Sequence, residues 1–294
     1  MDLTDKNQLL DYLKLHGLWA KKGLSQNFLV DKGALEKIVE AAELKPDDFV
    51  VEIGPGLGVL TRELTDKAGE VVAVEMDEKL SELLLEGKSP KLKIICSDIL
   101  KVNLDEIIGT RKYKVVANIP YHISSRILEL FLSRENKPEL VVLLVQKEVA
   151  ERICAKPGEM STLAVSVQLY GKPEIVDIVP ANSFFPAPKV DSAILRIAIY
   201  NLQLSIFNKL PIANYQSEQK LEQAFFRCVH VGFSSKRKTL VNNLASGFHI
   251  DKKEAFDIIK SIGLRETARA QELSIEDWKK LTNKISQFTF FNFH

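Results

Sequence analysis

Cysteine and long apolar stretches are both scarce in the 294-residue chain. The longest uninterrupted aliphatic run extends from Leu140 to Val145, far too short to cross a membrane as a helix. The first residues, MDLTDKNQLLDYL, carry acids and lack a long apolar core, which argues against a secretory signal. We therefore expect a cytoplasmic protein with no membrane association.

The chain contains only three cysteines, Cys96, Cys154 and Cys228, and they lie far apart. Their spacing matches no metal-ligand pattern, and an odd, sparse set is typical of a reducing compartment. We expect three buried, unreactive thiols and no metal site.

Strong net charge is also lacking, since the formal charge is +1. The charge is unevenly divided, because residues 1–200 hold 26 Lys and Arg against 30 Asp and Glu, a balance of −4. From Asn201 onward there are 14 against 9, a balance of +5. This asymmetry favours contact between the C-terminal part and a nucleic acid, although a merely solvated basic surface would have the same composition.

The first 200 residues show a regular alternation of strand-like and helix-like segments. Short runs rich in Val and Ile, separated by helical patterns, predict a mostly parallel sheet covered by helices on both faces. The expected strands are residues 47–53, 69–76, 92–98, 113–118 and 139–146, and the expected helices are 31–44, 59–69, 77–87 and 124–134.

The remainder of the chain has a different pattern. Residues 174–200 contain two β-rich runs around a proline-rich turn, which predicts a hairpin that closes the sheet. A polar segment, residues 201–217, predicts a linker. We therefore predict an α/β domain with a Rossmann-like sheet over 1–200 and a small all-α domain over 201–294. Its expected helices are 218–233, 236–244, 252–262 and 274–285.

A glycine-rich turn lies between the first expected strand and the helix after it. The stretch VVEIGPGLGVLT places Gly54, Gly56 and Gly58 in a GxGxG spacing, which differs from the GxGxxG of dinucleotide binding. Pro55 also stiffens a turn that phosphate binding would need open. Glu75 closes the second strand, where a carboxylate can accept hydrogen bonds from both hydroxyls of a ribose.

Asp98 ends the third strand, where an acid can accept from an adenine amino group. Taken singly, a glycine turn can serve packing and an acid at a strand end can be a helix N-cap. Together they lie at the carboxyl ends of neighbouring parallel strands, the usual ligand position of such sheets. This combination favours a nucleoside site without a phosphate.

The phosphate-free glycine turn, Glu75 and Asp98 together resemble the S-adenosylmethionine site of class I methyltransferases. In that family the glycines pack against the methionine part, the first acid holds the ribose and the second holds the adenine. By this resemblance Met76 lies against the adenine face, although a core methionine is nearly as good an interpretation.

The stretch VVANIPYHISS ends the fourth strand with Asn118, Ile119, Pro120 and Tyr121. It is similar to the motif of class I methyltransferases that act on exocyclic amines. An adenine N6 amine is a poor nucleophile, and acceptors at the Asn118 side chain and at a carbonyl near Ile119 would draw it toward tetrahedral geometry. Pro120 fixes the turn, and Tyr121 offers a flat surface for a flipped-out base. The alternative is a turn with a packed tyrosine.

A second aromatic segment, NSFFPAPKVDS, spans Asn182 to Ser192. Its two prolines make a rigid loop that could hold Phe184 or Phe185 against a base, although paired aromatics are usually core. The pattern F-x-P-x-P-x-V-x-S resembles the signature of ribosomal RNA adenine N6,N6-dimethyltransferases. The match implies that Phe184 is the stacking residue, while the residues themselves leave the choice with Phe185 open.

The N-terminal stretch KKGLSQNFLVD is similar to a segment that lies over the methyl donor in the same family. By this resemblance Asn27 and Leu29 contact the donor. Ser25 stands where the family usually has glycine, so the local backbone is expected to differ.

Two branches of this family have different substrates. One dimethylates two adjacent adenosines near the 3′ end of small-subunit (16S) ribosomal RNA during ribosome biogenesis. The other methylates one adenosine of large-subunit (23S) RNA and confers macrolide resistance. The stretches SSKRKTLVNNL and RAQELSIEDW resemble the small-subunit branch, in which a basic segment begins a helix. An assembly factor whose methylation is secondary is a further alternative.

The resemblance implies a transferase that uses S-adenosylmethionine, releases S-adenosylhomocysteine and needs no metal. The basic cluster Lys236, Arg237 and Lys238 is expected to neutralise RNA phosphates, and Lys14, Lys21 and Lys22 could extend that surface. Since RNA is recognised largely by shape, the expected partner is 16S RNA within the immature small subunit. We expect a monomer, because no exposed apolar stripe indicates a partner.

Overall fold

The computed structural model describes residues 1–19, 26–87, 89–200 and 215–292. Two compact units divide the chain: Met1–Glu151 with Gly171–Tyr200, and Arg152–Tyr170 with Asn201–His294. The segment Arg152–Tyr170 thus groups with the C-terminal unit, and a domain boundary at residue 200 stays a prediction. Ser25, Lys21 and Lys22 lie outside the described residues.

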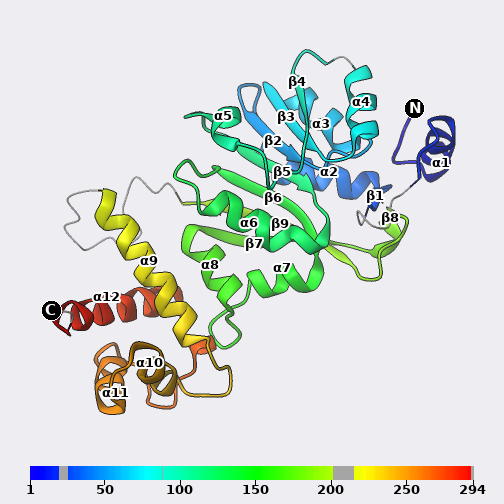
Figure 1. Ribbon diagram of the computed structural model, residues 1–294. Helices are drawn as coiled ribbons and strands as arrows, with labels where there is room; N and C mark the ends of the chain where they lie inside the picture. The colour runs from blue at the N-terminus through cyan, green and yellow to red at the C-terminus, as the bar shows by residue number, and fades with distance from the viewer. Residues whose placement is uncertain (20–25, 88, 201–214, 293–294) are drawn as a thin grey trace. The chain divides into compact units, whose positions relative to one another are not determined.

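The first unit is built on a seven-stranded sheet. Its strands are β2 (Phe49–Ile53), β3 (Glu70–Glu75), β4 (Leu92–Cys96), β5 (Lys114–Asn118), β6 (Leu140–Gln146), β7 (Gly171–Val179) and β9 (Ser192–Ile199). The spatial order is β4-β3-β2-β5-β6-β9-β7, which Figure 1 lets the reader follow. The strands β2 to β6 pair in parallel, and β9 joins β6 and β7 antiparallel.

This topology confirms the fold class expected from the sequence, including the closing hairpin of β7 and β9. The chain runs from β2 outward to β4, then returns to place β5 on the other side of β2. Order reversal of this kind opens a crevice at the carboxyl ends of the two central strands. The topology therefore puts the ends of β2 and β5 side by side.

The helices of this unit connect the strands. They are α1 (Lys6–Leu15), α2 (Lys32–Ala41), α3 (Val59–Lys67), α4 (Glu78–Glu86), α5 (Leu104–Ile108), α6 (Ser124–Leu132) and α7 (Lys147–Ile153), the last of which reaches into the second unit. A small two-stranded sheet joins β1 (Phe28–Leu29) to β8 (Phe184–Phe185). The elements α1, α5, α7, β1 and β8 were not predicted from the sequence.

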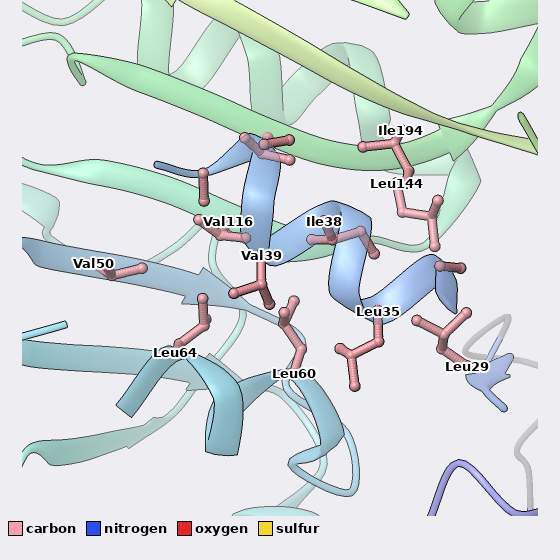
Figure 2. Close-up of a cluster of buried hydrophobic side chains, with 14 of the residues drawn as sticks. Leu29, Leu35, Ile38, Val39, Val50, Leu60, Leu64, Val116, Leu144 and Ile194 are labelled. Atoms are coloured by element: carbon pink, nitrogen blue, oxygen red, sulfur yellow. The ribbon is translucent and has the colours of Figure 1, made fainter. Parts of the chain in front are cut away.

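A cluster of aliphatic side chains lies between α2, α3 and the sheet. Figure 2 shows Ile38 and Val39 of α2 directed toward residues of α3 and of the central strands. Asp31 begins α2 by accepting a hydrogen bond from the Ala34 N–H at 3.0 Å. Burial of these side chains fixes α2 and α3 against the sheet. The cluster includes Leu35, Leu60, Leu64, Val50, Val116, Leu144 and Ile194.

The N-terminal helix α1 covers a second apolar cluster. Its buried residues Leu9 and Leu13 belong to the same cluster as Leu57 of the glycine turn and Leu80 of α4. Asp5 caps the helix by accepting from the Gln8 N–H at 2.9 Å. The helix thus packs beside the glycine turn.

Lys114, at the start of β5, is a buried cation with three partners. Its Nζ donates to the carbonyl oxygens of Ala42 at 3.1 Å and Glu43 at 2.6 Å, just after α2. It also lies 2.8 Å from Asp48 Oδ2. The two carbonyl contacts therefore tie the end of α2 to β5, and the ion pair ties β5 to the residue before β2.

The second unit is helical. The described part comprises α8 (Thr162–Tyr170), α9 (Tyr215–Gly232), α10 (Leu240–Phe248), α11 (Lys252–Ser261) and α12 (Ile275–Asn292). Its core includes Trp278, whose ring stacks on Phe233 with centroids 5.6 Å apart. The helix expected from Lys236 begins only at Leu240, because Thr239 caps it.

The expectation of three buried thiols is wrong. Cys228 is buried, and burial raises its pKa to about 12. Cys96 is exposed at the end of the edge strand β4, and Cys154 is partly exposed. Because β4 lies at the edge of the sheet, Cys96 at its end is not covered by a neighbouring strand. The apolar pattern of residues 92–98 does not show that this strand is at the edge.

Within the described ranges, no helix is long and apolar enough to cross a membrane.

We expect replacement of Lys114 by methionine to lower the free energy of unfolding by about 3–5 kcal/mol, because Asp48 is left as an unpaired charge with little solvent. In the double variant Lys114→Met, Asp48→Asn, the free energy of unfolding should fall by less than the sum of the decreases in the two single variants. Urea denaturation measures both quantities. A loss below about 1 kcal/mol for Lys114→Met would contradict this account.

Candidate functional site

A crevice opens at the carboxyl edge of the sheet, around the ends of β2, β3, β4 and β5. The structure brings most of the predicted site residues to this one place, although they are far apart in the sequence. The predicted residues that line the crevice are Asn27, Leu29, Gly54, Gly56, Glu75, Met76, Asp98, Asn118 and Tyr121.

The glycine turn forms one wall of the crevice. Gly54 and Gly58 have φ values of 63° and 78°, a backbone conformation that residues with a side chain rarely adopt. A Cβ at Gly58 would lie 2.5 Å from a methyl carbon of Leu84. A Cβ at Gly54 would lie 3.8 Å from the carbonyl oxygen of Asn118, an ordinary van der Waals distance, so the turn and the end of β5 are neighbours.

Glu75 is buried at the end of β3 and is held by backbone donors. Its Oε2 accepts from the Gly56 N–H at 3.1 Å, and its Oε1 accepts from the Asp77 N–H at 2.8 Å. Burial raises the pKa of this carboxyl, and the two N–H donors oppose the rise. Each oxygen keeps a second lone pair for a ligand hydroxyl.

Asp98 and Met76 lie at the same edge. Asp98 is partly exposed, and its Oδ1 accepts from the Leu100 N–H at 3.0 Å, so it also caps the turn after β4. Met76 is 53% exposed and lines the crevice, which rules out the alternative of a core methionine. An exposed thioether beside two carboxylates offers an apolar surface to a flat ring.

Glu52, which the sequence analysis did not single out, is a third acid of the crevice. It is 1% exposed, and burial raises its pKa to about 8. The negative charge of Glu75 raises the pKa of Glu52 further. The nearby Thr61 hydroxyl lowers this pKa, although the Thr61 hydroxyl and the Glu52 carboxyl are not hydrogen-bonded. Its Oε2 has no hydrogen-bond partner among the described residues.

The charges of the crevice define the ligand it suits. Three acids, Glu52, Glu75 and Asp98, line it, and among its described lining residues there is no Lys or Arg. Such a site disfavours phosphates and favours a ligand with positive charge and hydroxyl donors. A nucleoside that bears a cationic group fits the carboxyls of Glu75 and Asp98 and the glycine turn.

The end of β5 forms the opposite wall. The Asn118 Nδ2 donates to the backbone carbonyl of Asn27 at 3.4 Å, which directs the Oδ1 of that amide away from Asn27. Ile119 is 2% exposed, so it anchors the turn in the core. Pro120 has φ −57° and ψ 129° and starts the short helix η2 (Tyr121–Ile123).

Tyr121 is half-buried at the mouth of the crevice. Its hydroxyl forms a hydrogen bond of 2.7 Å with Ser192 Oγ, and Ser124 Oγ donates to its carbonyl at 3.0 Å. Burial raises the pKa of the phenol, and the Ser192 hydroxyl opposes the rise. The phenol is therefore neutral near pH 7, with its hydroxyl held by Ser192 and its backbone by Ser124.

The two candidate aromatics of β8 lie differently from Tyr121. Phe184 is 3% exposed and belongs to the cluster under α2, while Phe185 is partly exposed and has Lys6 Nζ 5.6 Å from its ring centre. Neither of them lines the crevice. A base could stack on Phe184 only after this segment moved.

The basic cluster Lys236, Arg237 and Lys238 lies in the second unit, in the exposed loop before α10. The buried amide of Asn243 donates to the carbonyls of Gly232 at 2.6 Å and Ser235 at 3.1 Å. A side chain of α10 thus holds the loop, and the three cations extend into solvent.

Comparison with known proteins places these features in a family. The family model described as ribosomal RNA adenine dimethylase matches residues 17–287. A protein of Dehalococcoides mccartyi, named ribosomal RNA small subunit methyltransferase A, is 45% identical over 277 residues, which cover 93% of this chain and 91% of that protein.

Two crystal structures are similar to the chain over most of its length. A dimethyladenosine transferase from Plasmodium falciparum has a TM-score of 0.72 and 26% identity, and covers 88% of this chain and 98% of its own. The 23S rRNA methyltransferase ErmE has a TM-score of 0.69 and 28% identity, and covers 89% and 100%. The chain thus shares its fold with a dimethyladenosine transferase and with a 23S rRNA methyltransferase.

Replacement of Glu52 by glutamine should change how stability depends on pH. Between its ordinary pKa of 4.5 and about 8, the unfolded chain loses the proton of Glu52 while the folded chain keeps it. Stability is thus full below 4.5 and is lost as the pH rises to about 8, by at most about 1.4 kcal/mol per pH unit.

The Glu52→Gln variant lacks this loss, so its melting temperature relative to the unmodified protein should rise from pH 5 to pH 8. Thermal unfolding at several pH values, without ligand, measures the difference. A difference that stays constant with pH would show that Glu52 is ionised in the folded protein.

Proposed function

The chain belongs to the family of ribosomal RNA adenine dimethylases, and we propose how its crevice performs that activity on small-subunit RNA. The enzyme transfers methyl groups to N6 of adenine. One observation carries the proposal for the site: Asn118, at the end of β5, lies against the glycine turn that ends β2, with its carbonyl 3.8 Å from a Cβ position of Gly54. Donor and acceptor sites therefore adjoin.

We propose that the crevice binds S-adenosylmethionine, whose sulfonium supplies an electrophilic methyl group. Glu75 accepts hydrogen bonds from the ribose hydroxyls, and Asp98 accepts from the adenine amine of the donor. Met76 covers the adenine face, and the buried carboxyl of Glu52 lies beneath the glycine turn that holds the methionine part. Asn27 and Leu29 cover the donor from the side of β1, and Gly54 and Gly56 leave room for its methionine part.

The target adenine occupies the side of Asn118. In the first transfer the Asn118 Oδ1 and a backbone carbonyl near Ile119 accept the two N6 hydrogens, which turns the nitrogen lone pair toward the methyl group. In the second transfer one N6 hydrogen remains, and one of these two acceptors holds it. Tyr121 stacks on the base, which must leave its helix to reach the crevice. No strong base is required, because N6 carries a positive charge once it has accepted the methyl group and then loses its proton readily. Phe184 stays a predicted second stacking surface that needs a movement of β8.

We propose that the basic cluster Lys236, Arg237 and Lys238 binds RNA phosphates. Its three cations are exposed, and the Asn243 amide fixes the loop that carries them. The proposed partner is 16S RNA within the immature small subunit in the cytoplasm, on which the chain acts as a monomer. Two adjacent adenosines near the 3′ end are the proposed targets, each methylated twice.

The large-subunit alternative has support from the fold alone, because a 23S rRNA methyltransferase shares it. The higher sequence identity to a small-subunit methyltransferase favours the small-subunit substrate. An assembly factor whose methylation is secondary would use the same surfaces. A variant that cannot transfer methyl groups separates that possibility.

Replacement of Asn118 by alanine should lower the rate of methyl transfer by about 100-fold or more, because N6 loses the acceptor that orients it. Donor affinity should change little, since Glu75 and Asp98 remain. Single-turnover transfer from labelled S-adenosylmethionine and calorimetric titration of the donor measure the two quantities. Near-normal methyl transfer would contradict the role assigned to Asn118. Normal maturation of the small subunit without methyl transfer would favour the assembly-factor alternative.

Joint replacement of Lys236, Arg237 and Lys238 by alanine should weaken RNA binding and make it less sensitive to salt. The slope of log affinity against log salt should fall by about 0.7–0.9 for each lost phosphate contact, so by about 2–3 in total. The matched control is Lys252→Ala with Lys253→Ala, two exposed cations of α11 in the same unit. Equal salt slopes for both variants would place the RNA elsewhere.

A further inference from the structure

The Tyr121 and Ser192 hydroxyls link two motifs that are separate in the sequence. Tyr121 follows β5, and Ser192 is the first residue of β9, with β6 between the two strands. Their oxygen atoms are 2.7 Å apart. This bond runs from the loop that presents the target base to a strand on the far side of β6.

Ser192 is a fixed point in the sheet. It is 0% exposed, and it pairs with Gln146 of β6 and with Val179 of β7. The carbonyl of Asp191 accepts from the Lys147 N–H at 3.0 Å, which secures the start of β9. A buried hydroxyl on a strand with neighbours on both sides can hold a partner in one position.

The bond matters because a tyrosine ring is otherwise loosely held. A side chain can adopt several rotamers about its Cα–Cβ bond, and Tyr121 is partly exposed in the lining of the crevice. Its backbone is fixed by Pro120 and by the Ser124 hydroxyl, so Ser192 supplies the contact at the other end of the ring. With the backbone and the hydroxyl oxygen both held, the side chain cannot swing about its Cα–Cβ bond, so the ring keeps one position in the crevice.

We infer that Ser192 is a positioning residue for methyl transfer: through the Tyr121 hydroxyl it fixes the ring on which the target adenine stacks. The inference rests on the proposed function of Tyr121. It assigns the tyrosine hydroxyl a purpose that stacking alone does not need, since a phenylalanine ring would stack as well. Ser192 is not among the lining residues of the crevice, so it acts on the base only through Tyr121.

The inference predicts a particular division of effects. Loosening the ring misplaces N6 relative to the methyl donor and lowers kcat. Binding of the donor depends on Glu75 and Asp98, and RNA affinity depends on contacts outside this bond. The donor Kd and the RNA Kd should therefore stay the same, whereas a general loss of structure would change all three.

The test compares Ser192→Ala, Tyr121→Phe and the double variant on unmethylated small subunits with saturating donor. Each single change should lower kcat about 3- to 10-fold, the range expected for one hydrogen bond. The double variant should lose no more than either single variant, because both remove the same bond. Donor Kd is measured in parallel by calorimetric titration.

The matched control is Tyr113→Phe. Tyr113 precedes β5 at the opposite end of that strand, is 1% exposed, and its hydroxyl donates to the carbonyl of Asn136 at 3.0 Å. The control removes the same kind of atom and a similar bond, so it should lower the melting temperature and leave kcat unchanged. A fall in kcat for this control would mean that lost stability explains the Ser192 effect, which overturns the inference.

Two results concern the inference alone. An unchanged kcat for Ser192→Ala would overturn the role of Ser192. The same conclusion would follow if the fold-decrease in kcat of the double variant equalled the product of the two single decreases. Failure of the proposed function has a different signature: Tyr121→Ala would then methylate as fast as the unmodified enzyme. A strong loss for Tyr121→Ala with no loss for Ser192→Ala would keep Tyr121 as the stacking residue and remove Ser192.

Discussion

Adjacency of β2 and β5 in the parallel sheet is the constraint on which the rest of the site depends. Their register pairs Val50 with Lys114 and Glu52 with Val116, so the strands end at the same edge. The glycine turn and the Asn118 loop then meet, with the Asn118 carbonyl oxygen 3.8 Å from the position of a Cβ on Gly54. In the proposed assignment, the donor held by one strand end and the acceptor held by the other are thereby neighbours.

Burial gives the crevice its chemical preference. Glu52 and Glu75 are both buried acids, and the pKa of each is raised. Backbone N–H groups stabilise Glu75, while an oxygen of Glu52 has no such partner in the described part of the chain. A cationic nucleoside relieves the cost of both acids, which a phosphate ligand would increase. The same edge of the sheet therefore suits the proposed donor and disfavours nucleotides.

The sequence predicted features that depend on local pattern. The strands, the glycine turn and the acids at strand ends follow from alternation and spacing, and the topology then puts Glu75, Asp98 and Asn118 together. Features that depend on distant neighbours were missed. Glu52 reads as one polar residue within a strand, and the bond between Ser192 and Tyr121 needs the order of β5, β6 and β9. Burial of Phe184 likewise depends on α2, which packs over it.

The measurement that tests the account most directly is transfer of labelled methyl groups into unmethylated small subunits, with large-subunit RNA assayed beside them and nucleoside analysis of the product. We predict N6,N6-dimethyladenosine in the small-subunit RNA alone. Label confined to large-subunit RNA would contradict the assigned substrate. Donor binding without label in either RNA would contradict the assigned acceptor site and support only the assigned donor site.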